Sequence, residues 1–182
     1  MAADTKILAL PNAVLRAKAL PVEKVEFGSK KMSELIKKMS DILRATNDGI
    51  GIAAPQIGLS KRIFIASEEA LAIDDGWDET DEKEKKIKKK QWKHFVFINP
   101  EVLKISSKKV TGSEGCLSVP KKYGLVERAE KIRVRAYDER GRVFERGASK
   151  LFARLLQHEL DHLDGKLFTD KAKKLITIGD KT

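Results

Sequence analysis

The sequence predicts a single domain that contains both helices and strands, and three observations support this. Residues 151–165 carry apolar side chains at three- and four-residue steps, which is typical of one face of a helix. Residues 131–137 alternate between basic and apolar side chains, as expected of a strand with one exposed face. A chain of 182 residues is also long enough to bury a core. We therefore expect residues 1–182 to form one domain.

The remaining elements are predicted from similar patterns. An extended entry and a proline-marked turn lead to a helix at residues 33–46, for which Ser33 would be the cap. Residues 138–142 form the turn of a hairpin, and its return strand begins at Val143. Predicted strands occupy residues 62–66, 94–98, 101–106 and 131–137.

A charged insertion is expected at about residues 67–93. Its first half is rich in aspartate and glutamate, and its second half is rich in lysine. Such a segment is typical of a solvated excursion between two strands. The alternative is that the lysines contact RNA.

The segment His-Glu-Leu-Asp-His at residues 158–162 indicates a metal site. Residues four apart share a helix face, so His158 and His162 can reach one metal ion. Glu159 would lie beside the open coordination position, where a carboxylate can take a proton from water. Gln157 and Asp161 could orient the two ligands. The alternative is an amphipathic helix whose two histidines merely face the same way.

A catalytic site of this kind usually has a third protein ligand. Downstream of His162 the chain offers only aspartates, so we expect the third ligand upstream. The chain has one cysteine, Cys116, and one further histidine, His94. His94 is expected to begin a strand. Cys116 as a thiolate would complete a set of two histidines and one cysteine, and the alternative is a small buried side chain.

Residues 49–58, Gly-Ile-Gly-Ile-Ala-Ala-Pro-Gln-Ile-Gly, are predicted to be a tight loop that exposes its backbone. The glycine spacing and the lack of a preceding strand exclude a dinucleotide-binding fingerprint, and a Walker loop is excluded because no Lys-Ser/Thr pair follows. The primary amide of Gln56 could donate to an oxyanion. The alternative is a structural glycine turn.

The charge balance bounds the partners and the compartment. The chain has 37 Lys and Arg against 27 Asp and Glu, and the sequence pI is about 9.6. Such a surface favours polyanions such as ribosomal RNA, or is simply a lysine-rich soluble surface. No signal peptide or membrane span is recognised, and a single cysteine excludes an intramolecular disulfide. We expect a cytoplasmic protein, organellar if a transit peptide has been removed, without DNA or membrane partners.

Three stretches together resemble the peptide deformylase family. They are GIGIAAPQIG at residues 49–58, EGCLSVP at residues 114–120 and QHELDHLDG at residues 157–165. Their order and approximate spacing match the family, and the similarity extends from about Lys6 to Asp170.

The resemblance implies an α+β fold, in which antiparallel β-sheets pack around a central helix that carries the HELDH segment. It implies one divalent metal ion per chain, bound by Cys116, His158 and His162. Fe²⁺ would be the physiological metal, with Zn²⁺, Ni²⁺ or Co²⁺ as alternatives. The implied reaction removes the formyl group from N-formylmethionyl nascent peptides and releases formate.

The resemblance also implies roles for individual residues. Glu159 would be the general base, while the Gln56 amide and the Leu117 backbone N–H would hold the oxyanion. Glu114 and Arg128 would pair and brace the loop of Cys116. Arg154 lies near the expected position of the methionine side chain, in a stretch that is more often apolar. The expected substrate-binding residues are Gly51, Ile50, Leu151 and Leu155.

Two other functions fit the same residues. One is a different metallohydrolase, such as a peptidase, with the same ligands. The other is a basic module that binds RNA or the ribosome and uses a structural metal.

Overall fold

The structure is a computed structural model that describes residues 6–46, 49–74 and 92–178. Its N-terminal part contains short 3₁₀ turns at Ala13–Arg16 and Lys24–Glu26, followed by helix α1, Lys30–Ala45. The predicted cap of this helix was wrong. Ser29 caps it by accepting a hydrogen bond from the Met32 N–H at 3.1 Å. The helix begins earlier because Met32 belongs to its buried face.

Five antiparallel strands form the larger sheet, in the order β1-β2-β3-β6-β7. The strands predicted at residues 94–98 and 101–106 are a single strand, β3, which has a register shift between Ile98 and Glu101. Asn99 lies in this shift with a φ of 49°. Such an irregularity bends a strand without ending it. The strands are β1 (Gly51–Ala53), β2 (Ile63–Ser67), β3 (His94–Ile105), β6 (Lys131–Tyr137) and β7 (Val143–Ser149).

The alternation predicted for β6 and its hairpin with β7 is confirmed. Ile132, Val134 and Ala136 are buried, while the basic residues between them are exposed. The segment predicted to be a charged, solvated insertion, at about residues 67–93, falls between β2 and β3, and its character as an insertion stays a prediction. It begins with the short helix α2, Glu69–Asp74, and residues 75–91 lie outside the described part of the chain.

A second sheet has the order β4-β5-β8 and was not predicted as strands. It consists of β4 (Lys109–Cys116), β5 (Val119–Ala129) and β8 (Leu175–Thr177). Gly112, Glu114 and Arg128 turn toward the interior in β4 and β5. Because these residues are not apolar, the two strands lack the hydrophobic alternation that predicts a strand.

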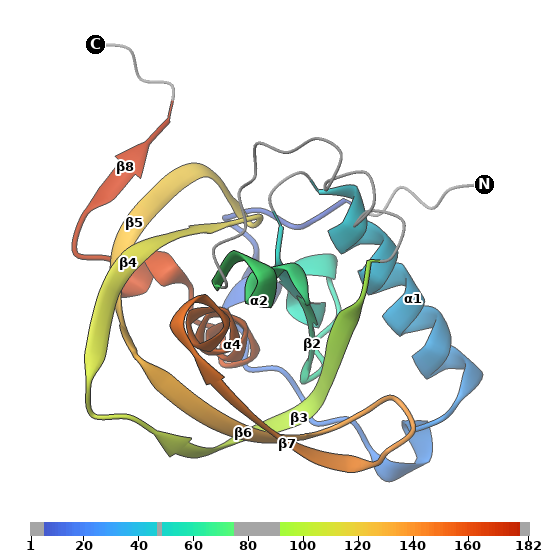
Figure 1. The fold of residues 1–182 in the computed structure, drawn as a ribbon. Helices are drawn as coiled ribbons and strands as arrows, with labels where there is room; N and C mark the ends of the chain where they lie inside the picture. Colours follow the sequence, from blue (N-terminus) through green and yellow to red (C-terminus); the bar gives the residue numbers. More distant parts are fainter. Residues whose placement is uncertain (1–5, 47–48, 75–91, 179–182) are drawn as a thin grey trace.

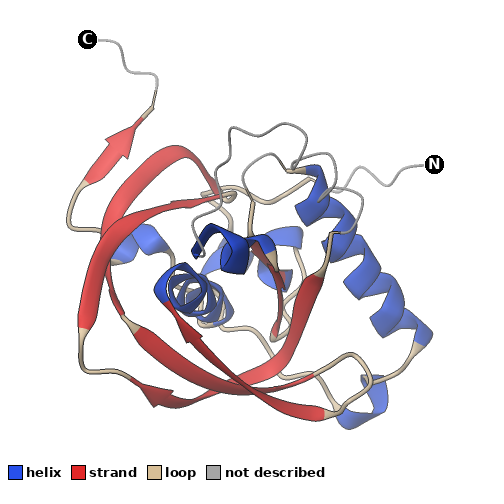
Figure 2. Ribbon diagram, viewed as in Figure 1, coloured by secondary structure: helices blue, strands red, loops and turns tan. Residues whose placement is uncertain are grey.

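Helix α4, Lys150–Leu163, lies at the centre of the molecule (Figure 1). Figure 2 shows strands of both sheets curving around it. Helix α1 lies on the side of the molecule away from β4 and β5. Phe152, Leu156 and Leu163 are fully buried in its interface with the sheets. The predicted α+β architecture, with antiparallel sheets around this helix, is confirmed. A further 3₁₀ turn, Ala54–Ile57, follows β1, and another, Phe168–Asp170, follows α4. Among the described residues, no helix has the length and apolar character needed to span a membrane.

Candidate active site

Three side chains with metal-binding atoms meet between α4 and the end of β4. Cys116, His158 and His162 place one ligand atom each within 4.8 Å of one another. The His162 Nε2 atom lies 3.2 Å from the Cys116 Sγ atom. A tetrahedral site with usual metal–ligand distances has ligand-to-ligand edges of roughly 3.3–3.6 Å. A thiolate and two imidazoles at this spacing fit one divalent metal ion.

A bulge at the end of β4 sets the position of Cys116. The pairing changes from Gly115 with Tyr123 to Cys116 with Val119, which leaves residues 120–122 of β5 outside the ladder. Bulges of this kind redirect the neighbouring side chains. The Sγ atom then accepts hydrogen bonds from the Ser118 N–H at 3.4 Å and from the Gln56 amide at 3.6 Å. These two contacts fix the direction of the Sγ atom, which is the atom that would bind a metal ion.

A buried carboxylate orients the first histidine. The Nδ1 atom of His158 lies 3.0 Å from Glu114 Oε2, so its Nε2 atom is left for the metal. The expected pair of Glu114 and Arg128 is present, with two hydrogen bonds of 2.8 Å each. Burial favours a higher pKa for Glu114, but the hydrogen bonds and positive charges of Arg128 and His158 lower this pKa well below its usual range.

The two residues expected to orient the metal ligands direct their side-chain hydrogen bonds to other groups. The Gln157 amide bonds to the backbone N–H and carbonyl of Ala129. The Asp161 carboxylate accepts hydrogen bonds from Arg128 and Lys171. Asp161 therefore acts indirectly, because it holds Arg128, which in turn binds the Glu114 carboxylate beside His158.

Glu159 has the environment of a general base. It is buried, and its Oε2 atom receives no hydrogen bond from any described residue. Burial, together with the negative charge of Glu114, raises the pKa of Glu159 to about 7, while His158 opposes the rise. A base with a pKa near neutrality can both accept and return a proton. The pKa of His162 is lowered by burial and by the positive charges of His158 and Arg128, which favours the neutral imidazole that binds a metal.

The Gln56 amide is fixed with its donor side toward the cysteine. Its Oε1 atom accepts a hydrogen bond from the Ala53 N–H at 2.8 Å. Its Nε2 atom therefore faces Cys116 Sγ at 3.6 Å and Ser118 Oγ at 3.2 Å. The stretch at residues 49–58 is not a simple loop, because it contains β1 and a 3₁₀ turn that hold this amide.

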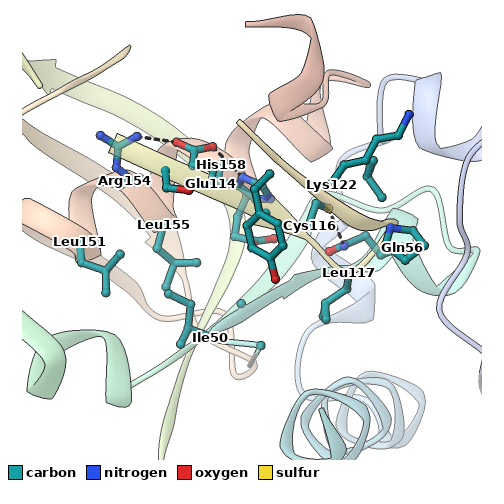
Figure 3. Close-up of a pocket in the computed structure, with 18 of the residues that line it drawn as sticks. Ile50, Gln56, Glu114, Cys116, Leu117, Lys122, Leu151, Arg154, Leu155 and His158 are labelled. Atoms are coloured by element: carbon teal, nitrogen blue, oxygen red, sulfur yellow. Dashed lines mark hydrogen bonds and ion pairs between the residues drawn. The ribbon is translucent and has the colours of Figure 1, made fainter. Parts of the chain in front are cut away.

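A pocket of about 360 Å³ opens beside these groups (Figure 3). Nine of the ten predicted site residues line it, and the tenth, His162, has its Nε2 atom 3.2 Å from the Cys116 Sγ atom. The sequence did not indicate the contribution of Ser118, which contacts both Gln56 and Cys116, or of Lys121 and Lys122 at the pocket. Their one signal was position, because Ser118 lies within the EGCLSVP stretch and the two lysines follow it directly. The nine are Ile50, Gly51, Gln56, Cys116, Leu117, Leu151, Leu155, His158 and Glu159.

The chain matches one known protein family over most of its length. The sequence profile of the polypeptide deformylases matches residues 4–177. The chain belongs to the polypeptide deformylase family. The peptide deformylase of Syntrophomonas wolfei is 39% identical over 167 residues, which is 92% of each chain. Peptide deformylase 1 of Bacillus subtilis is 38% identical over 172 residues, covering 94% of this chain and 92% of that protein.

Solved deformylase structures have the same fold. The class I type b peptide deformylase of Acinetobacter baumannii, bound to Met-Ala-Ser, superposes with a TM-score of 0.77. It is 32% identical, and the match covers 94% of this chain and 99% of that one. A peptide deformylase from Legionella pneumophila is 38% identical with a TM-score of 0.73, covering 92% and 85% of the two chains.

The family assignment confirms the enzyme class expected from the sequence. Members of this family are metal-dependent hydrolases that remove the formyl group from the N-formylmethionine of nascent polypeptides. The cluster of Cys116, His158 and His162 is consistent with this metal dependence. A different metallohydrolase and a basic RNA-binding module are not favoured.

At Gly51, strand β1 closely approaches helix α4 of this deformylase fold. A Cβ atom there would lie 2.5 Å from Glu159 Oε1 and 2.6 Å from Leu155 Cδ1. We expect Gly51→Ala to destabilise the fold by about 1–3 kcal/mol, as overpacking does, and to displace Glu159 with a loss of kcat. Urea unfolding and a formate-release assay would measure both effects. The matched control is Gly147→Ala, because a Cβ atom at Gly147 meets nothing within 4 Å. Equal behaviour of the two variants would contradict the expectation.

Proposed function

We propose that the chain hydrolyses the N-formyl group of formylmethionyl peptides in the pocket beside Cys116, His158 and His162. One observation carries the proposal. The buried carboxylate of Glu159, whose Oε2 atom has no hydrogen-bond partner among the described residues, lines the same pocket as the fixed amide donor of Gln56. A base and an oxyanion donor beside three metal-binding side chains are the groups that amide hydrolysis needs.

Cys116, His158 and His162 would hold the metal. A divalent ion bound there supplies Lewis acidity, which makes water more acidic and polarises a carbonyl. Glu114 and Arg128 support this set by fixing the orientation of the His158 ring.

Glu159 moves the proton in the proposed reaction. Its carboxylate takes a proton from the attacking water, and then passes that proton to the departing amine. The pKa of about 7 suits both steps, because the group neither holds the proton too weakly nor too strongly at neutral pH.

The oxyanion that develops on the formyl oxygen needs hydrogen-bond donors in fixed positions. We propose the Gln56 Nε2 group and the backbone N–H of Leu117 for this role. Leu117 lies in the two-residue turn between β4 and β5 and lines the pocket. Both donors border Cys116, so they act at the same point as the metal ligands.

The methionine side chain is proposed to lie against the apolar part of the pocket. Ile50 comes from the segment before β1, while Leu151 and Leu155 come from successive turns of α4. In Figure 3 these three side chains lie on one side of the pocket, away from Gln56. Gly51 lines the same side and allows the β1 backbone to approach Glu159.

We expect Gln56→Ala to lower kcat by about 10² to 10³-fold, the usual cost of removing one oxyanion donor, with metal content unchanged. Steady-state formate release with counted metal would measure this. Ser118→Ala is the control, because it removes a contact of the Gln56 amide and leaves the donor in place. Full activity of Gln56→Ala would remove Gln56 from the proposed oxyanion site.

The products of a defined peptide test the proposed reaction. Formyl-Met-Ala-Ser should yield formate and Met-Ala-Ser, as detected by mass spectrometry, and acetyl-Met-Ala-Ser should be hydrolysed far more slowly. Formation of formylmethionine and Ala-Ser would instead indicate a peptidase that uses the same ligands. Metal-loaded, folded protein that produces neither set of products would overturn the proposal.

We propose Fe²⁺ as the working metal. Two imidazoles and a thiolate also accept Zn²⁺, Co²⁺ and Ni²⁺, and the preference for Fe²⁺ rests on the family resemblance. The Fe²⁺ form prepared without oxygen should be more active than the Zn²⁺ form and should lose activity in air. A Zn²⁺ form that is at least as active would make zinc the working metal.

Three broader statements complete the proposal. Residues 1–182 act as one catalytic domain, which a single cooperative unfolding transition would support.

The protein works in the cytoplasm, where formylated nascent chains are made. Its basic surface, with a formal charge of +10, contacts the ribosome weakly. The fraction of protein that sediments with ribosomes should fall steeply as the salt concentration is raised. Binding that does not depend on the salt concentration would contradict the electrostatic contact.

A further inference from the structure

Arg154 has no role in the proposed reaction, yet its guanidinium group donates to four acceptors. It lies on α4 four residues before His158, so both side chains face the β4–β5 hairpin. The Nη1 atom donates to Glu114 Oε1 at 2.9 Å, and the side chain is 12% exposed. The sequence placed this arginine near the substrate side chain, but its positive charge is directed at Glu114.

The same guanidinium group also holds the backbone of the hairpin. It donates to the carbonyl oxygens of Val110 at 2.8 Å, Gly112 at 3.3 Å and Val126 at 2.9 Å. The first two belong to β4 and the third to β5. One side chain of α4 therefore binds backbone atoms of both strands of the hairpin.

Gly112 shows that β4 is shaped around this contact. A Cβ atom on Gly112 would lie 2.8 Å from Arg154 Nη2 and 2.9 Å from Arg154 Cζ. Any larger residue would occupy the space of the guanidinium group. Glycine inside a strand often marks such a close approach.

The metal ligands come from the two elements that Arg154 joins. Cys116 ends β4, whereas His158 and His162 belong to α4. Glu114 connects them, because its Oε1 atom accepts from Arg128 and Arg154 while its Oε2 atom faces His158 Nδ1 at 3.0 Å. Arg128 ties this carboxylate to β5, and Arg154 ties it to the helix that carries the histidines.

We propose that Arg154 is a positioning residue, which fixes the His158 ring through Glu114 and holds α4 at the correct spacing from the β4–β5 hairpin. The inference rests on the proposed function of the metal site. Figure 3 shows the guanidinium end of Arg154 directed toward Glu114, on the same side of the pocket as Leu151 and Leu155. The substrate side chain would thus meet an arginine whose charge is paired with Glu114. The side of the pocket formed by Leu151 and Leu155 keeps its apolar character.

The test is metal affinity, measured by competition with a chelator, together with the visible spectrum of the Co²⁺ form. Arg154→Leu should weaken Zn²⁺ binding by about 10 to 100-fold, the usual effect of losing a group that supports a metal ligand, and should shift the Co²⁺ bands. Arg154→Lys keeps one positive charge and should lie between the wild type and Arg154→Leu. It also serves as the test if the leucine variant does not fold.

Two comparisons separate positioning from general destabilisation. Arg135→Leu also removes an arginine that is paired with a glutamate, Glu145, but on the exposed face of β6, and it should leave affinity and spectrum unchanged. In a Glu114→Gln background, the further loss from Arg154→Leu should be smaller than in the wild type.

Wild-type affinity and an unshifted Co²⁺ spectrum in both Arg154 variants would overturn the inference, as would full additivity with Glu114→Gln. Neither readout requires substrate. A failed formate assay would therefore count against the proposed function without deciding the role of Arg154.

Discussion

Replacing Glu159 by alanine should lower kcat by about 10² to 10⁴-fold, the range that general acid–base catalysis contributes, while one metal ion stays bound. The reason is that Glu159 lies beside His158 without belonging to the cluster of three ligand atoms. Its carboxylate has an unpaired oxygen and a pKa raised by burial to about 7, so it can transfer the proton that the reaction requires. Formate release and metal analysis on the same samples would measure both parts of this prediction.

The isosteric variant Glu159→Gln is the control for packing. It preserves the contact with Gly51 and cannot accept the proton, so its activity should be as low as that of the alanine variant. Near-normal turnover in either variant would show that another group is the base. Loss of the metal in both variants would instead make Glu159 part of the metal site.

Replacing Cys116 by alanine should weaken metal binding by more than the roughly 10 to 100-fold that loss of a supporting residue costs, because a direct ligand is removed. The thiolate is also the one sulfur ligand of the cluster, so the preference among Fe²⁺, Zn²⁺ and Co²⁺ should change. Chelator competition with each metal would measure affinity and preference together.

Cys116→Ser keeps the size of the side chain and replaces sulfur with a poorer donor, so its affinity should lie between those of the wild type and the alanine variant. The Ser118 N–H and the Gln56 amide that donate to sulfur can still donate to the serine oxygen. Unchanged metal content and affinity in Cys116→Ala would remove Cys116 from the ligand set.

The sequence predicted those elements whose buried residues are apolar and recur with the period of a helix or a strand. Helix α4 carries apolar residues on its packed face, and β6 alternates between buried apolar and exposed basic residues. The helix around Ser33 was predicted three residues too late, because serine can cap a helix at several positions and packing of Met32 decides which.

The strands β4 and β5 were not predicted, because some of their interior residues serve the metal site and are not apolar. Three of their interior positions hold Gly112, Glu114 and Arg128, which serve the metal site or leave space for Arg154 and do not contribute apolar side chains to a core. The ligands themselves were predicted from short motifs. The partners of Arg154 lie 28 to 44 positions away along the chain, and no local pattern brings them together.

The most direct test of the central claim is a metal titration of catalysis. Protein freed of metal by a chelator would be loaded stepwise with Fe²⁺ in the absence of oxygen, and formate release from formyl-Met-Ala-Ser would be followed. The site formed by Cys116, His158 and His162 predicts a rate that rises in proportion to bound metal and stops rising at one ion per chain. Formate release that does not depend on metal, or a break at another stoichiometry, would contradict the account.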